Sequence, residues 1–142
     1  MPKRILVTGK NGQLGQSLQK VAAEFTHYDF VFVGRDELDL SSSASIEKYF
    51  AAAKPFVAII NTAAYTAVDQ AESEVELANQ VNHLAVAQLG DIAKVQNAML
   101  LHVSTDYVFD GKSYRPYVET DATAPQNQDS PTKLKGEQAM LV

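Results

Sequence analysis

Three glycines recur at intervals of three within the segment Thr8–Gly15. In a strand-to-helix turn, Gly9 would permit the tight turn, Gly12 would let a pyrophosphate approach the backbone, and Gly15 would let the helix pack closely. The N-terminus of a helix also offers unpaired N–H donors and a partial positive charge to a phosphate. The alternative is that the glycines serve the turn alone. The predicted diphosphate contacts are Gly9, Asn11, Gly12, Gln13, Leu14 and Gly15.

A second set of polar residues follows about twenty residues later, where dinucleotide-binding proteins contact the adenosine ribose. An acidic side chain there binds the 2′-hydroxyl of NAD, whereas an arginine favours the 2′-phosphate of NADP. This chain has Gly34 at the usual acidic position and Arg35 next to it, so NADPH is favoured over NADH. Arg35 and Asp36 as solvated loop charges are the alternative. Asp39 and Leu40 could flank the adenine, with Asp39 accepting from its amino group.

Short apolar runs alternate along the chain with longer amphipathic stretches. The runs that predict strands are 4–8, 30–33, 57–60 and 99–103. The stripes that predict helices are 14–25, 46–53 and 78–92. Strands joined by helices are typical of a parallel sheet, and the continuously apolar first strand indicates that helices cover both sheet faces. We therefore predict an α/β fold of the Rossmann type, a doubly wound parallel sheet.

The predicted sheet is short for this fold. Doubly wound dinucleotide-binding domains ordinarily have six strands, and this sequence predicts about four. We therefore interpret residues 1–142 as an NAD(P)-binding domain that is the N-terminal part of a longer enzyme. A naturally reduced variant is the alternative.

Composition narrows the class of function. The chain has 142 residues, 46% hydrophobic and 20% charged, with 12 basic and 17 acidic residues and a net charge of −5. Such a balance is ordinary for a globular domain and offers no basic field for nucleic acid. No apolar run approaches the length of a membrane span or signal peptide, and cysteine is absent. We therefore expect a cytoplasmic protein that binds neither nucleic acid nor membrane.

Five longer motifs carry a family resemblance. They are Thr8–Gly15, Leu38–Leu40, Asn61–Glu72, Ser104–Gly111 and Thr132–Glu137. Together they resemble the N-terminal half of the dTDP-4-dehydrorhamnose reductase family, which belongs to the extended short-chain dehydrogenase/reductase superfamily. The resemblance implies reduction of the C4 ketone of dTDP-4-dehydro-L-rhamnose by NADPH or NADH to give dTDP-L-rhamnose. It also implies a dTDP-sugar as the binding partner, and it is compatible with a homodimer.

The resemblance assigns roles to individual residues. Ala63, Ala64 and Tyr65 would line the cofactor, and Lys133 would bind the nicotinamide ribose and lower the pKa of a catalytic tyrosine. Thr105 would hydrogen-bond the ketone, a bond that strengthens as negative charge develops on the oxygen. The implied substrate contacts are Ser104, Thr105, Asp106, Val108 and Phe109.

The chain departs from the family pattern at the catalytic tyrosine, where Asp129 stands instead. A carboxylate is ionised at neutral pH and cannot donate the proton that a tyrosine donates. Pro131 lacks the amide of an interior helical residue, so the last helix is predicted to begin there. We therefore expect impaired activity, and a noncatalytic NADP-binding module resembling the regulatory β subunit of methionine adenosyltransferase is the alternative.

No metal site is expected. The family often has a glutamate in a magnesium site where this chain has Gln16-Ser17. His27, His83 and His102 also lack the spacing of metal ligands, so we interpret each as structural or exposed.

Overall fold

A four-stranded parallel sheet forms the centre of the computed structural model, which describes residues 3–63, 79–103, 135 and 138. The strands are β1 (Lys3–Thr8), β2 (Tyr28–Val33), β3 (Ala58–Asn61) and β4 (Met99–His102). They lie in the order β2-β1-β3-β4, and each neighbouring pair is parallel. The predicted α/β fold with a parallel sheet is confirmed.

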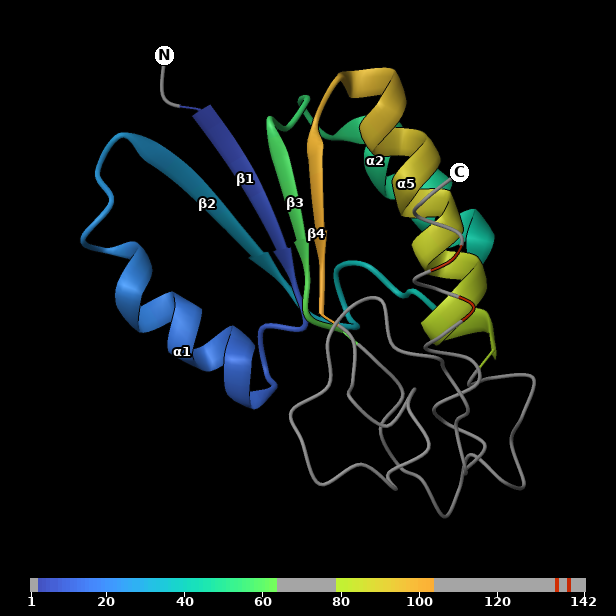
Figure 1. Ribbon diagram of the computed structural model, residues 1–142, viewed down its shortest axis with the longest axis horizontal. Coiled ribbons are helices and arrows are strands. Elements are labelled where there is room, and N and C mark those ends of the chain that lie inside the picture. Colours follow the sequence, from blue (N-terminus) through green and yellow to red (C-terminus); the bar gives the residue numbers. More distant parts are fainter. Residues whose placement is uncertain (1–2, 64–78, 104–134, 136–137, 139–142) are drawn as a thin grey trace, which may run out of the picture.

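Helices lie on both faces of this sheet (Figure 1). The described helices are α1 (Gln13–Ala22), α2 (Ser43–Ala52), the π-helical segment η1 (Gln80–Leu84) and α5 (Ala85–Gln96). Helix α1 lies on one face, and α2 and α5 lie on the other. From β1 the chain moves outward through α1 to β2, and it then returns past β1 to β3. The strand order therefore reverses between β1 and β3, which is where doubly wound sheets bind ligands, at the carboxyl ends of the strands.

The hydrophobic core lies between the sheet and the pair α2 and α5. Leu6 and Ile59 from the sheet and Ile46 and Leu89 from the two helices are fully buried. Ser42 begins α2 by accepting a hydrogen bond from the Ser45 amide, and Asn97 ends α5 in the left-handed conformation. The capping residues Ser42 and Asn97 thus bound helical segments whose apolar residues are buried in the core.

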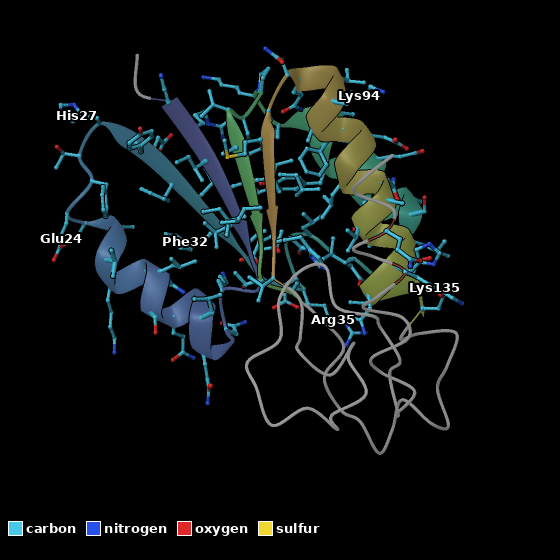
Figure 2. The ribbon with its side chains drawn as sticks, viewed as in Figure 1. Glu24, His27, Phe32, Arg35, Lys94 and Lys135 are labelled. Carbon is cyan, nitrogen blue, oxygen red and sulfur yellow. The ribbon has the colours of Figure 1, made fainter. Side chains whose placement is uncertain are left out.

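The opposite face is less completely covered. Figure 2 shows Phe32 on the side of the sheet nearer α1, where its ring stacks on that of Phe30. On β4, Leu100 packs against the core, whereas Met99 and Leu101 on the alternate face are 71% and 54% exposed. The expectation that helices lie on both faces of the sheet is confirmed, and within the described residues one face of β4 keeps large apolar side chains exposed.

Several boundaries and one helix type differ from the sequence prediction. Helix α1 ends at Ala22, so Phe25 follows the helix and is half exposed rather than part of its buried stripe. Strand β3 begins one residue later than predicted, at Ala58. Residues 80–84 are π-helical because their hydrogen bonds span one extra residue, which a hydrophobic stripe does not reveal.

The predicted helix start at Pro131 lies outside the described residues. In the described ranges, every helix is too short or too polar to cross a membrane.

Candidate nucleotide-binding site

The glycine loop between β1 and α1 has the geometry that its three glycines predict. Gly9 has a φ of +74°, a left-handed conformation that other residues rarely adopt, and its carbonyl accepts from the Gly12 amide at 3.1 Å. A Cβ on Gly15 would collide with the Gly9 carbonyl and would lie 2.8 Å from Lys10 Cα. The missing side chain of Gly15 therefore lets the start of α1 pack closely, as predicted, and the surface that it packs against is the Gly9–Lys10 turn.

The first turn of α1 presents backbone donors. Gly12 is the N-cap residue and makes no side-chain cap hydrogen bond. The following amides of Gln13 and Leu14 belong to the first helical turn, whose N–H groups have no partner within a helix. Gln16 and Gln19 brace the loop by donating from their side chains to the Asn11 and Lys10 carbonyls, at 2.9 and 2.8 Å. Backbone donors and a helix dipole thus face one region, as an anion site requires.

A buried polar network closes the floor of the site where β1, β3 and β4 end. The Thr8 hydroxyl donates to Asn61 Oδ1 at 2.6 Å, and both side chains are almost fully buried. Asn61 Nδ2 lies 3.1 Å from His102 Nδ1, and the Thr62 hydroxyl donates to the Thr8 carbonyl at 2.6 Å. Because buried polar groups are costly unless they are paired, this network holds the three strand ends in one arrangement.

The tip of β2 carries an acid that the sequence analysis did not identify. Glu37 Oε2 accepts from the Gly34 amide at 2.9 Å, and Glu37 Oε1 pairs with Lys10 Nζ. The hydrogen bond from Lys10 is the largest of several influences that lower the pKa of Glu37. Gly34 occupies the position where an acidic residue is usual. The carboxylate of Glu37, three residues later in the sequence, therefore lies next to that position. The signal that could have revealed this is the capping-box spacing, in which a Glu reaches back to an amide three residues earlier.

Arg35 and Asp39 lie next to this tip. Arg35 Nε is 3.9 Å from Asp39 Oδ1, and the Arg35 side chain is 78% exposed. Asp39 Oδ1 also accepts from the Ser41 amide and hydroxyl, and the hydroxyl is the main cause of the lowered pKa of Asp39. Gln80 on η1 donates to the Leu40 carbonyl at 3.3 Å, which joins this loop to a segment forty residues away.

These elements surround one cavity of about 560 Å³, a size typical of small-molecule sites. Its predicted lining residues are Gly9, Asn11, Gly12, Gln13, Leu14, Arg35, Asp39, Leu40 and Ala63. Six further residues line it that sequence reasoning did not assign: Thr8, Gly34, Leu38, Ser41, Thr62 and Val81. Gly15 is buried beneath the loop instead of lining the cavity.

The remaining predicted site residues lie outside the described part of the chain. They are Ala64, Tyr65, Ser104, Thr105, Asp106, Val108, Phe109, Asp129 and Lys133. Their roles stay predictions. Within the described residues, no three His, Asp or Glu side chains form a group that could hold a metal ion.

A parallel sheet of this order, with a glycine turn that opens a helix beside its switch point, defines a doubly wound protein of the Rossmann type. Within that class the chain belongs to the family described as the RmlD substrate binding domain, whose model matches residues 3–142.

Curated relatives support this assignment. The chain is 43% identical to the dTDP-4-dehydrorhamnose reductase of Aggregatibacter actinomycetemcomitans over 138 residues, which cover 97% of this chain and 47% of that protein. It is 44% identical to the enzyme of the same name from Burkholderia thailandensis, covering 96% of this chain and 45% of that one. The chain thus spans about half the length of the curated relatives it matches.

Solved structures give the same result. A dTDP-4-dehydrorhamnose reductase from Bacillus anthracis, solved in complex with NADP, matches with a TM-score of 0.90 at 35% identity. That match covers 99% of this chain and 50% of the Bacillus chain. The Clostridium acetobutylicum enzyme matches with a TM-score of 0.89 at 36% identity, covering 97% of this chain and 49% of that one.

Proposed function

We propose that this chain binds a nicotinamide dinucleotide, NADPH or NADH, at the carboxyl ends of β1, β2 and β3. The observation that carries the proposal is the glycine turn, in which Gly9 is left-handed and Gly12 leaves its backbone open. An ideal Cβ on Gly12 would have its nearest neighbour 3.5 Å away, so the backbone there can be approached closely. A pyrophosphate would accept hydrogen bonds from the first amides of α1, with its charge stabilised by the helix dipole.

The cavity supports a direction for the bound molecule. Gly34 and Arg35 form its rim at the tip of β2, and Thr62 and Ala63 form its rim beyond β3. The adenosine would lie over β2, flanked by Asp39 and Leu40, and the nicotinamide would extend past Ala63. Ala64, Tyr65 and Lys133 would complete the cofactor site.

We further propose that a protein of the length of these relatives uses this domain to reduce dTDP-4-dehydro-L-rhamnose to dTDP-L-rhamnose. The bound dihydronicotinamide supplies the hydride in such a reduction. Thr105, assisted by Ser104, would hydrogen-bond the ketone oxygen and stabilise its developing charge. Asp106, Val108 and Phe109 would contact the dTDP-sugar.

Asp129 stands where the family has the tyrosine that donates the proton, and an aspartate does not supply that proton at neutral pH. A tyrosine with a pKa of about 10 holds its proton at neutral pH, whereas an aspartic acid with a pKa of about 3.9 has lost it. A positioned general acid contributes typically 10²- to 10⁴-fold to a rate. The 142-residue chain is therefore expected to bind cofactor without measurable turnover.

Titration of the chain with NADPH and NADH, followed by nicotinamide fluorescence and calorimetry, tests the binding proposal. Failure of both to bind at millimolar concentration would refute it. NADPH oxidation with dTDP-4-dehydro-L-rhamnose tests the second proposal, using the chain, Asp129→Tyr, and Asp129→Tyr fused to the second half of a reductase relative. We expect turnover from the fusion alone, because Asp129→Tyr by itself supplies the proton donor but not the second half of the enzyme, which would complete the sugar-nucleotide site. Turnover by the unmodified chain would contradict the role given to Asp129.

A further inference from the structure

Lys10, Asn11 and Glu37 converge on the backbone of Gly34 at the tip of β2. An ideal Cβ on Gly34 would lie 3.1 Å from Asn11 Nδ2, 3.3 Å from Lys10 Cε and 3.4 Å from Glu37 Oε2. Lys10 reaches this point because its amide donates to the Val33 carbonyl at 3.2 Å, which places the glycine loop beside the end of β2. A cation and an anion from separate segments therefore lie beside Gly34, which lines the cavity.

Two kinds of contact hold these charges, and they differ in strength. The Lys10–Glu37 pair has side chains 30% and 42% exposed, and pairs of such exposure are weak and screened by salt. Glu37 is held in addition by the Gly34 amide at 2.9 Å, from within its own turn. Lys10 can therefore leave the pair at small cost, whereas the Glu37 carboxylate stays at the Gly34 amide.

We propose that Glu37 and Lys10 together discriminate the ribose 2′-hydroxyl of NADH from the 2′-phosphate of NADPH. This inference rests on the proposed cofactor binding at the same site. A 2′-hydroxyl donates to the Glu37 carboxylate and leaves the Lys10 pair intact. A 2′-phosphate draws Lys10 away and pairs with it and with Arg35, but it then lies beside a carboxylate of like charge. Glu37 thus opposes the preference for NADPH that Arg35 alone predicts.

The variant Glu37→Gln isolates the charge. Glutamine keeps a carbonyl oxygen that accepts from the Gly34 amide, so the turn is preserved, while the negative charge disappears and Lys10 becomes available. We expect the ratio of dissociation constants, NADPH over NADH, to fall about fivefold, since removal of one like charge at close range in water is worth about 1 kcal/mol. The matched control is Asp36→Asn, which removes the same charge from the neighbouring exposed residue and should change the ratio by less than about twofold.

The variant Lys10→Met tests the Lys10–Glu37 pair by removing its cation. It leaves Glu37 unchanged, so the hydrogen bond between Glu37 and the Gly34 amide is not at risk. We expect weaker NADPH binding with a shallower salt dependence, and little change for NADH. Lys20→Met, which removes an exposed lysine from the last turn of α1, is its control. Competition by 2′,5′-ADP and by 5′-AMP should show the same changes, because these probes carry the 2′ difference without the nicotinamide.

The outcomes separate the inference from the proposed function. If the wild-type chain binds both cofactors and neither Glu37→Gln nor Lys10→Met changes their ratio, the inference is wrong and cofactor binding stands. If the wild-type chain binds none of the four nucleotides, the proposed function fails and the inference fails with it. Opposite shifts of the ratio in the two variants, with both controls unchanged, would establish the pair as the discriminating element.

Discussion

The two ends of the sheet are built from the same strands and differ in chemistry. At the amino end, the Arg4 guanidinium lies 4.5 Å from the centre of the Phe56 ring and donates to the Lys54 carbonyl at 2.6 Å. The Phe56 ring is fully buried, and its amide donates to Gln96 Oε1 at 3.0 Å. This end is closed by packing between side chains whose polar atoms are paired.

At the carboxyl end, backbone and small polar side chains replace that packing. Gly9 exposes its turn to the cavity, Thr8 and Thr62 line it, and the buried Asn61 side chain accepts from the Thr8 hydroxyl beneath them. The comparison indicates that the amino end contributes stability alone, whereas the carboxyl end also carries the proposed binding site. Substitutions at the amino end should therefore lower the free energy of unfolding without changing the dissociation constant of the cofactor.

The largest effect is expected at Phe56. Replacement by alanine removes a buried ring and leaves a cavity, so the free energy of unfolding should fall by about 3–5 kcal/mol in urea denaturation. The neighbouring Val57→Ala, at a side chain 43% exposed, is the matched control and should cost less than about 1 kcal/mol. Should Phe56→Ala fail to fold, Phe56→Leu keeps most of the volume and should remain folded. Weaker cofactor binding by folded Phe56→Leu would contradict the separation of the two ends.

Gly15→Ala should affect both quantities, because the new Cβ would collide with the Gly9 carbonyl. Overpacking of this kind costs about 1–3 kcal/mol of stability. The forced shift of the glycine turn should also weaken NADPH binding by about tenfold or more, because one lost hydrogen bond to a charged phosphate is worth about 1.5–3 kcal/mol.

Gly90→Ala on α5 is the control for that change. Its Cβ would meet Leu100 Cδ2 at 3.9 Å, an ordinary contact, and alanine favours a helix by about 0.5–1 kcal/mol over glycine. The chain should become more stable with unchanged binding. Equal binding by Gly15→Ala and wild type would show that the glycine turn is not the phosphate site.

The fold was largely predictable because its signals are local. Apolar runs and stripes located the four described strands and their helices, and the turn at Gly9 was predicted from glycine spacing alone. The strand order and the exposed apolar side chains on one face of β4 were not predictable in this way. They depend on how segments pack, and Leu100 and Leu101 are alike in sequence although only one of them faces the core.

The site was predictable where one segment builds it and not where distant segments meet. Asn11, Gln13 and Leu14 belong to the glycine motif, and these predicted cofactor contacts line the cavity. Val81 lines the same cavity from a π-helical segment, and Lys10 meets Glu37 across 27 residues. The hydrophobic pattern of the sequence does not predict such contacts, since they form only after β1 and β2 pair.

Thr8→Val tests the floor of the carboxyl end. Valine keeps the shape of threonine and removes the hydroxyl that donates to Asn61 Oδ1 and accepts from the Ala63 amide. A buried polar group left without its partner costs about 1–3 kcal/mol, so the free energy of unfolding should fall by that amount. Thr26→Val, at an exposed loop residue, is the control and should have little effect. Equal stability of Thr8→Val and wild type would mean that the network does not hold the strand ends.

The smallest expected effect is a dependence of the folding stability on pH, caused by Asp39 at the carboxyl end of the sheet. The Ser41 hydroxyl lowers the pKa of Asp39 from its ordinary value of 3.8. A carboxyl group with a lowered pKa in the folded state adds stability that is complete above its unfolded pKa and is lost as pH falls through the folded pKa. Urea midpoints should therefore decline as the pH falls below 3.8, and Asp39→Asn should make that decline shallower. Asp91→Asn, at an exposed residue of α5, should retain the wild-type slope. Identical slopes for wild type and Asp39→Asn would show that the Ser41 contact does not stabilise the ionised form.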